Sequence, residues 1–282
     1  MKKLLISAIL SFTVFILFAQ REYIPITADL EKFFKTKTFV VLEASPMSEF
    51  NFEIQEVMKR DWKITGFEFI SPADFKEKSK NESYSFLYTS YVVFEKDKTD
   101  SRYLFLHLSL GGDNLTIDDL RDMVSVPLGY YGADPDNYIY KLGVILRFMQ
   151  NHVNLIYKDP GLISNNIFKH YNDNVGNAHD KTLYLVEDEL AKDVATAARI
   201  KQNYPFKFKI VTREEIKQAI QDNDNNIVFL HKVGPEGKKK DARCYKIIMG
   251  AGDANFYYFD FHKVSDKNPD GFLKSDFNNL KK

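Results

Sequence analysis

The chain has almost no cysteine and no excess of charge of either sign. It contains one cysteine in 282 residues, Cys244, so no disulfide can form within it. Lysine plus arginine number 39, and aspartate plus glutamate also number 39. A neutral balance excludes the basic surface that nucleic-acid-binding proteins need. The fold therefore depends on hydrophobic burial, and 44% apolar residues in a chain of this length can form one or two cores.

Motifs of common enzyme classes are also missing. No Gly-x-Ser-x-Gly nucleophile turn is present, and no glycine-rich phosphate loop ends in Gly-Lys-Ser or Gly-Lys-Thr. The phrase Gly250–Asp253 lies between two expected strands, so it lacks the helix amino terminus that would attract a phosphate. Cys244 has no family signature that would supply a partner histidine, and we expect a small buried side chain. We therefore predict no catalytic residue, no cofactor and no metal.

Only one long apolar run exists, and it lies at the amino terminus. Two lysines precede Leu4–Phe18, and Ala19 follows. This pattern predicts a secretory signal peptide over residues 1–19, with Gln20 as the mature start. A membrane anchor is the alternative, but 15 apolar residues are fewer than the roughly 20 that a spanning helix needs. We expect a soluble exported protein, periplasmic or secreted, without a transmembrane helix after signal removal.

Removal of this segment changes the charge only slightly. It removes two lysines and no acidic residue, so 37 basic residues remain against 39 acidic ones, a formal charge of −2. The mature protein therefore still offers no strongly charged surface to nucleic acid or to an anionic membrane.

The order of expected elements is the same in both halves of the chain. In each half a buried strand, an amphipathic helix, a second strand and a second helix come first, and three strands and a last helix follow. The expected elements of the first half span residues 37–43, 45–62, 63–70, 71–75, 84–94, 101–110, 122–131 and 138–156. Those of the second half span residues 181–187, 188–202, 204–211, 212–216, 225–233, 243–250, 255–264 and 272–280.

Short local patterns repeat at matching places. Ser71 with Asp74 and Thr212 with Glu215 have the spacing of a capping box at the second helix of each half. A glycine-containing turn ending in Asp113 or Asp253 follows the fourth strand. We interpret these turns as equivalent hairpins, in which Gly112 and Gly252 adopt positive φ and the aspartate bonds the turn backbone. An Asp-x-Arg pattern, ending in Arg102 or Arg243, precedes the fourth strand.

These repeats predict an α/β fold built by tandem duplication of a two-layer β-α-β-α-β-β-β-α unit. Strand-helix-strand connections require parallel neighbours, and the short hairpin turns require antiparallel ones, so each sheet is mixed. The predicted organisation after the signal peptide is a lead-in over 20–36, a first unit over 37–157, a linker over 158–180 and a second unit over 181–282.

This order of elements resembles the amino-terminal domain of TolB and the related CsgG-like periplasmic domains. The resemblance covers each half separately and is carried by topology. The Pro-Phe pair that follows the first strand in that family is absent, since Val40–Pro46 and Tyr184–Leu190 have other residues there. The resemblance implies a non-catalytic domain of cell-envelope assemblies, and it implies no particular site residue.

Histidines and acids give few candidate metal ligands. The densest set lies in the predicted linker: His170, Asp173, His179 and Asp180. Its spacing fits neither a zinc site nor the calcium loop pattern, and a polar connecting segment explains it equally well. His107 and His231 lie inside expected strands, where we interpret them as hydrogen-bonded core or edge residues.

The predicted function is that of an exported, non-catalytic binding or assembly protein of the cell envelope, with a protein partner. Duplication doubles the available surface, which suits bridging or avidity. Caps and turns explain the other repeated residues, so Arg102 and Arg243 are the predicted partner contacts.

Two alternatives stay open. One is an exported hydrolase whose site lies at the carboxyl ends of the strands, which directs attention to Glu43, Ser45, Glu187 and Asp188. The other is a carrier that holds a small ligand between the two units. The aromatic residues, 24 phenylalanines and 16 tyrosines, are mostly in strands and indicate core packing before a sugar-binding surface.

Overall fold

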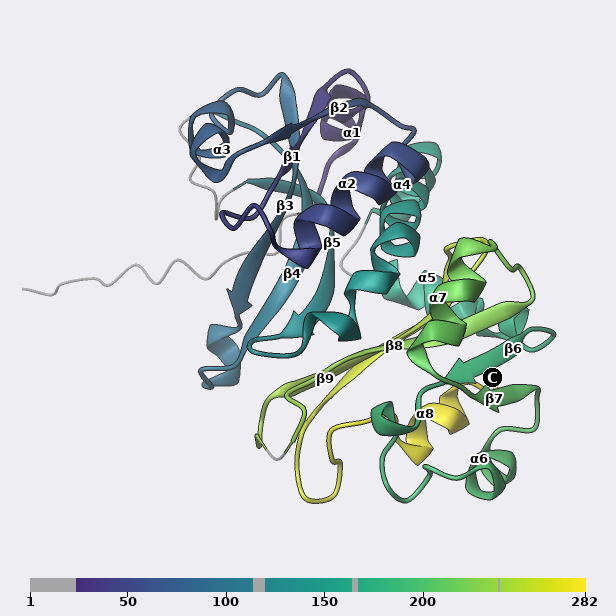
Figure 1. Cartoon of the computed structure of the whole chain (residues 1–282). Coiled ribbons are helices and arrows are strands. Elements are labelled where there is room, and N and C mark those ends of the chain that lie inside the picture. Colours follow the sequence, from purple (N-terminus) through teal and green to yellow (C-terminus); the bar gives the residue numbers. More distant parts are fainter. Residues whose placement is uncertain (1–23, 114–119, 164–166, 238) are drawn as a thin grey trace, which may run out of the picture.

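The structure is a computed structural model that describes residues 24–113, 120–163, 167–237 and 239–282 (Figure 1). The predicted signal peptide and its cleavage site before Gln20 lie outside these residues. No helix within the described ranges is both long enough and apolar enough to cross a membrane.

The first unit contains a five-stranded sheet in the order β2-β1-β3-β4-β5. Strand β1 (Lys37–Val41) lies between β2 (Gly66–Ile70) and β3 (Tyr84–Val93) and runs parallel to both. Strands β4 (Arg102–Leu110) and β5 (Arg121–Tyr130) continue the sheet as antiparallel neighbours. The sheet is therefore mixed, as predicted.

The second unit repeats this topology, with the order β10-β9-β8-β6-β7. Strand β6 (Thr182–Leu185) runs parallel to β7 (Phe208–Ile210) and β8 (Ile227–Val233). Strands β9 (Arg243–Gly250) and β10 (Phe256–Lys263) are antiparallel. The predicted two-unit α/β fold is confirmed, and the fourth and fifth strands are hairpin neighbours in both halves.

Helices cover both faces of the first sheet. Helices α1 (Thr27–Phe33), α2 (Glu49–Asp61) and α4 (Leu142–Lys158) share one hydrophobic core on one face, and α3 (Pro72–Lys78) packs against the other. Strand β2 lies on one side of β1 and β3 lies on the other, so the two crossover connections run in opposite directions across the sheet. Because crossover connections are right-handed, α2 and α3 lie on opposite faces. Figure 1 shows α2 and α4 side by side.

The second unit has the equivalent helices. Helices α6 (Ala197–Asn203) and α8 (Lys274–Asn279) share one core, and α7 (Arg213–Gln221) packs on the opposite face, toward the first unit. Both predicted capping boxes are present, one before α3 and one before α7. Short 3-10 helices occur at Glu95–Asp97, Pro135–Asn137, Ile139–Lys141, Pro160–Leu162, Val175–Ala178 and Glu187–Glu189.

One predicted helix is wrong in its first half. We predicted a continuous helix over residues 188–202, but α6 begins only at Ala197. Leu190 instead forms a bridge with Phe272, and the amide of Ala191 donates a hydrogen bond to the carbonyl of Phe272 at 3.0 Å. Pairing with the carboxyl-terminal segment holds Leu190 in an extended conformation, and a turn at residues 192–194 follows, so this stretch is not helical despite its apolar periodicity.

The predicted linker over 158–180 is a packed part of the second unit. It contains α5 (Ile167–Asp173), which lies against β10. Asn172 on α5 accepts a hydrogen bond from the backbone N of Phe259 at 2.7 Å and donates one to its carbonyl at 2.9 Å. Phe168 stacks on the ring of Phe259, with 3.9 Å between centroids.

The two units share a continuous core, and polar contacts cross between them. Arg147 on α4 donates hydrogen bonds to the carbonyls of Ala251 and Gly252, at 2.8 and 2.7 Å. Lys141, just before α4, forms a buried ion pair with Glu189 of the second unit at 3.3 Å. Helix α4 therefore belongs to the first sheet by sequence and also anchors the second unit.

Glycine at position 252 is required by a close approach rather than by positive φ. We predicted positive φ at Gly252, and this is wrong, since the left-handed residue of that turn is Ala254, with φ of 54°. A Cβ atom on Gly252 would lie 2.5 Å from the carbonyl oxygen of Asn223 and 2.7 Å from the amide nitrogen of Asn225. The turn at Gly112 continues into residues outside the described part.

Strand register corrects the repeated Asp-x-Arg pattern. Ser71 and Thr212 are equivalent cap residues, and from them the residue pairing between neighbouring strands can be followed across each sheet. This pairing places Arg243 at the position of Tyr103 and not at that of Arg102. A shift of one residue in a strand turns a side chain to the opposite face. Arg102 and Arg243 therefore occupy different environments.

Candidate functional site

A cleft of about 500 Å³ opens at the carboxyl end of β1. Its walls are Glu43 and residues 47–50 after β1, Tyr91 and Leu104 on β3 and β4, and the segment 130–139 before α4. We call this the first-unit cleft. Open α/β sheets bind their ligands at the carboxyl ends of parallel strands, which is the position of this cleft.

A single asparagine fixes one wall. Asn51 is 2% exposed, and its side chain donates to the carbonyls of Glu43 and Ser45 at 3.1 and 2.8 Å and accepts from the amide of Glu43 at 2.8 Å. Ser48 caps α2 by accepting from the amide of Asn51 at 3.1 Å. The loop is held at both ends, so Glu43 lines the cleft, whereas Ser45 contributes a carbonyl to the loop and does not line it.

The opposite wall contains a largely buried tyrosine. Tyr138 is 6% exposed, and none of the described residues forms a hydrogen bond with its hydroxyl group. Burial, reinforced by the charge of Glu43, raises the pKa of Tyr138 to about 12, so the hydroxyl stays protonated at neutral pH. Gly129 lies against the ring, since a Cβ atom there would be 3.3 Å from it.

The cleft carries charge of one sign. Four carboxylate side chains line it: Glu43, Glu49, Asp134 and Asp136. No lysine or arginine is among its lining residues, and within the described ranges none of these four carboxylates forms an ion pair. Asp134 accepts a hydrogen bond from the backbone N of Asp136 at 3.0 Å, which gives it a capping role.

Exposed apolar side chains surround the opening. Met47 is 76% exposed, Tyr91 is 55% exposed and Tyr131 is 54% exposed. The rings of Tyr91 and Tyr131 meet edge to face, with 5.2 Å between centroids. The guanidinium of Arg102 lies over the ring of Tyr131 at 5.6 Å. The structure thus places one predicted partner contact, Arg102, beside this rim.

Arg243 has a different position. Its side chain forms an ion pair with Asp97 of the first unit and lies 3.7 Å from the ring centroid of Phe94. Its amide donates to the hydroxyl of Tyr103 at 2.5 Å, and that hydroxyl donates to its carbonyl at 3.2 Å. Burial alone would raise the pKa of Asp97, but Arg243 and Lys263 lower it below its ordinary value. Arg243 therefore connects the two units.

The second unit has a wider groove of about 800 Å³ at the carboxyl ends of β6 and β7. Glu187 and Asp188, the hydrolase candidates of that unit, lie here. Asp188 pairs with Arg213 at 2.9 Å, and Glu215 pairs with Lys209 at 2.6 Å. Lys192 and Arg213 also line this groove, so it contains basic side chains, unlike the first-unit cleft. Both cavities lie within single units, not between them.

The predicted metal candidates are not brought together. The Nε2 atom of His179 bonds the carbonyl of Leu280 at 2.8 Å, and Asp173 pairs with Lys169. Among the residues that the structure describes, no group of three or more histidine, cysteine, aspartate or glutamate side chains is arranged to hold a metal ion.

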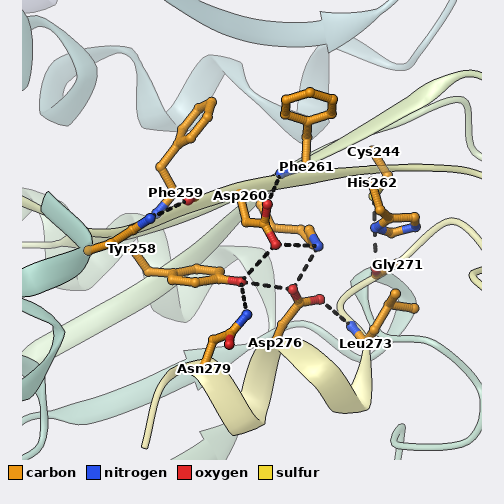
Figure 2. Close-up of polar contacts among 12 residues, drawn as sticks. Cys244, Tyr258, Phe259, Asp260, Phe261, His262, Gly271, Leu273, Asp276 and Asn279 are labelled. Atoms are coloured by element: carbon orange, nitrogen blue, oxygen red, sulfur yellow. Dashed lines mark hydrogen bonds and ion pairs between the residues drawn. The ribbon is translucent and has the colours of Figure 1, made fainter. Parts of the chain in front are cut away.

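A buried polar network beneath α8 has a structural explanation (Figure 2). Asp276 accepts hydrogen bonds from Tyr258 at 2.9 Å and from the amide of Leu273 at 2.7 Å, and it pairs with the buried Lys246 at 2.7 Å. These bonds satisfy the carboxylate and attach α8 to the sheet. Cys244 lies nearby, and burial raises the pKa of its thiol well above the ordinary value, so the thiol is a poor nucleophile.

The sequence did not reveal a second polar cluster, on the α3 face of the first sheet. His107 on β4 is 7% exposed, and its Nε2 lies 2.9 Å from the Ser90 hydroxyl. Its Nδ1 lies 3.1 Å from Asp122 and 2.8 Å from Ser125. Three adjacent strands contribute these residues, and in each strand the polar side chains point to the same face of the sheet. The sequence shows this alternation, but it does not show which polar residues meet until the strand register is known.

Comparisons with known proteins return no matching family model, curated protein or solved structure. The resemblance of each half to the TolB amino-terminal domain therefore stays a prediction. Function has to be argued from the arrangement of the sites.

Proposed function

We propose that this is an exported cell-envelope protein that holds a protein partner at the first-unit cleft and does not transform a substrate. The supporting observation is the combination of an acidic cleft with an apolar rim. Methionine and tyrosine are enriched in protein interfaces. Met47 and Tyr91 line the cleft, Tyr131 packs against Tyr91, and all three are largely exposed. An exposed apolar patch beside a cavity is typical of an interaction site.

The second unit supports this role by fixing the first. Buried ion pairs and the Arg147 contacts join the units into one body, so the cleft wall before α4 is held from both sides. A rigid wall reduces the conformational entropy lost on binding. Arg102, beside the rim, is proposed as a further contact to the partner.

Site-specific crosslinking tests this proposal. A photoreactive phenylalanine analogue replaces Tyr91 or Met47 in the full chain in producing cells, and the matched control places it at Phe52, which is 52% exposed but does not line the cleft. We expect the same discrete adduct from positions 47 and 91 and none from 52. Adducts of identical pattern from all three positions, or none, would overturn the proposal.

A serine hydrolase is the second candidate, and one observation favours it. The hydroxyl oxygen of Ser90 lies 2.9 Å from Nε2 of His107, and Nδ1 of His107 lies 3.1 Å from a carboxylate oxygen of Asp122. This is the order of groups that activates a serine nucleophile. A fluorophosphonate probe distinguishes this function from pure binding. Labelling that is lost in Ser90→Ala and retained in Ser125→Ala would establish a reactive serine. Absence of labelling at millimolar probe would exclude one.

A further inference from the structure

We infer that the first-unit cleft takes a lysine side chain from the partner, with the ammonium group among the cleft carboxylates. This inference rests on the proposed function and adds the chemistry of the ligand. The occupant is a basic segment of another protein, because charge complementarity with four unpaired carboxylates requires a cation.

Within the described part of the chain, the carboxylates of the cleft lack the basic partners that many carboxylates elsewhere on this molecule have. Asp97, Asp188 and Asp276 each have a basic partner within the chain. Glu43 and Glu49 have none among the described residues, although both line a concave site. A cation bound in this cavity would interact favourably with the carboxylates that line it.

Tyr138 gives a second, independent indication of a ligand. Its hydroxyl oxygen is held in the cleft without a hydrogen-bond partner among the described residues, on a side chain that is 6% exposed. The side chain is largely buried, but its hydroxyl reaches the space of the cleft, where it can accept a hydrogen bond from a ligand. An ammonium group has three N–H donors and no acceptor, so it can donate to this oxygen and to the carboxylates together.

The dimensions and the rings also suit a lysine. A volume of about 500 Å³ exceeds that of a bare ion and accommodates a long side chain with adjacent backbone. The rings of Tyr91 and Tyr130 line the cleft. Aromatic rings contact the methylene groups of lysine and attract its charge.

Isothermal titration with defined peptides tests the inference on the mature full chain. The probe is the peptide Ala-Gly-Lys-Gly-Ala with blocked termini, and its counterpart carries Nε-acetyl-lysine. We expect the lysine peptide to bind at least tenfold more tightly than the acetylated peptide. Raising the salt from about 0.05 to 0.5 M should weaken its binding several-fold.

Matched variants locate the binding. Glu43→Gln/Glu49→Gln should weaken lysine-peptide binding about tenfold, whereas Glu31→Gln/Glu187→Gln, which removes two carboxylates elsewhere, should change it less than about twofold. Tyr138→Phe keeps the ring and should weaken binding about threefold or more. Thermal unfolding of each variant shows whether it is folded.

Three outcomes overturn the inference: equal binding of both peptides, no binding up to millimolar peptide, or an equal effect of the control variant. Self-association of the chain that blocks the cleft would also overturn it, by identifying a second copy as the occupant. If position 91 still crosslinks a discrete partner in these cases, the proposed function stands and only the ligand chemistry is wrong. If both experiments fail, both proposals fall.

Discussion

Substitution of Lys141 by methionine should destabilise the protein more than any exposed lysine substitution. The Lys141 side chain is 0% exposed, and that of Glu189 is 5% exposed. Burial alone would lower the pKa of Lys141, but the charge of Glu189 and hydrogen bonds raise it above its ordinary value, so Lys141 stays charged. Removing one partner of a buried pair leaves an uncompensated charge and costs about 3–5 kcal/mol. The Oε2 atom of Glu189 already has no described hydrogen-bond partner, so nothing nearby replaces the lysine.

Thermal and urea unfolding measure this effect. For a chain of this size, about 4 kcal/mol corresponds to a Tm lower by roughly 10 °C. Lys59→Met is the matched control, because Lys59 pairs with Glu56 in an exposed helix pair, and its effect should stay within about 0.5 kcal/mol. Lys141→Met/Glu189→Leu removes both charges and should recover at least about half of the loss. Equal effects of Lys141→Met and Lys59→Met would refute the reasoning, as would a double variant less stable than the single one.

Three further predictions concern stability. Gly252→Val should lower the free energy of unfolding by about 1–3 kcal/mol, because its Cβ would overlap the backbone of residues 223–225. Gly66→Val should change the free energy of unfolding much less, since there is open space around a Cβ at that position. The urea midpoints of the two variants test this difference. Burial, with the charge of a nearby lysine, lowers the pKa of His231 to about 3. The unfolded chain binds that proton near pH 6.5, so stability should fall as the pH drops from about 6.5 toward 3, and His231→Gln should reduce this slope by up to about 1.4 kcal/mol per pH unit in pH-dependent urea titrations. Arg243→Ala should destabilise by about 1–3 kcal/mol and Arg102→Ala by less than about 0.5, and similar Tm values for both would contradict their different environments.

The topology could be predicted because local signals agreed with the global fold. Capping boxes at Ser71 and Thr212 marked the same helix in each half, and short apolar runs at matching spacing marked the strands. These signals depend on residues close in sequence, so they can be read without the structure. The helix predicted from residue 188 failed because Leu190 pairs with Phe272, a contact between distant segments.

The candidate site was predictable only in part. The rule for open α/β sheets directed attention to Glu43, which lines the cleft, and to Glu187 and Asp188, which line the second groove. Tyr138 could not be recognised, because its role depends on the segment before α4 lying across the cleft from the loop after β1, and these two segments are distant in sequence. The pairing of Arg243 with Asp97 likewise depends on how the two units meet, which no repeat within the sequence specifies.

Hydrogen–deuterium exchange with the lysine peptide tests the central claim most directly, because it reports where the protein binds. The account predicts slower exchange of backbone amides in residues 43–50 and 130–139, and no change with the acetyl-lysine peptide. Exchange within 186–215 should stay unchanged, because Lys192 and Arg213 line the groove there and repel a lysine side chain. Slower exchange confined to 186–215, or the same pattern with both peptides, would contradict the account.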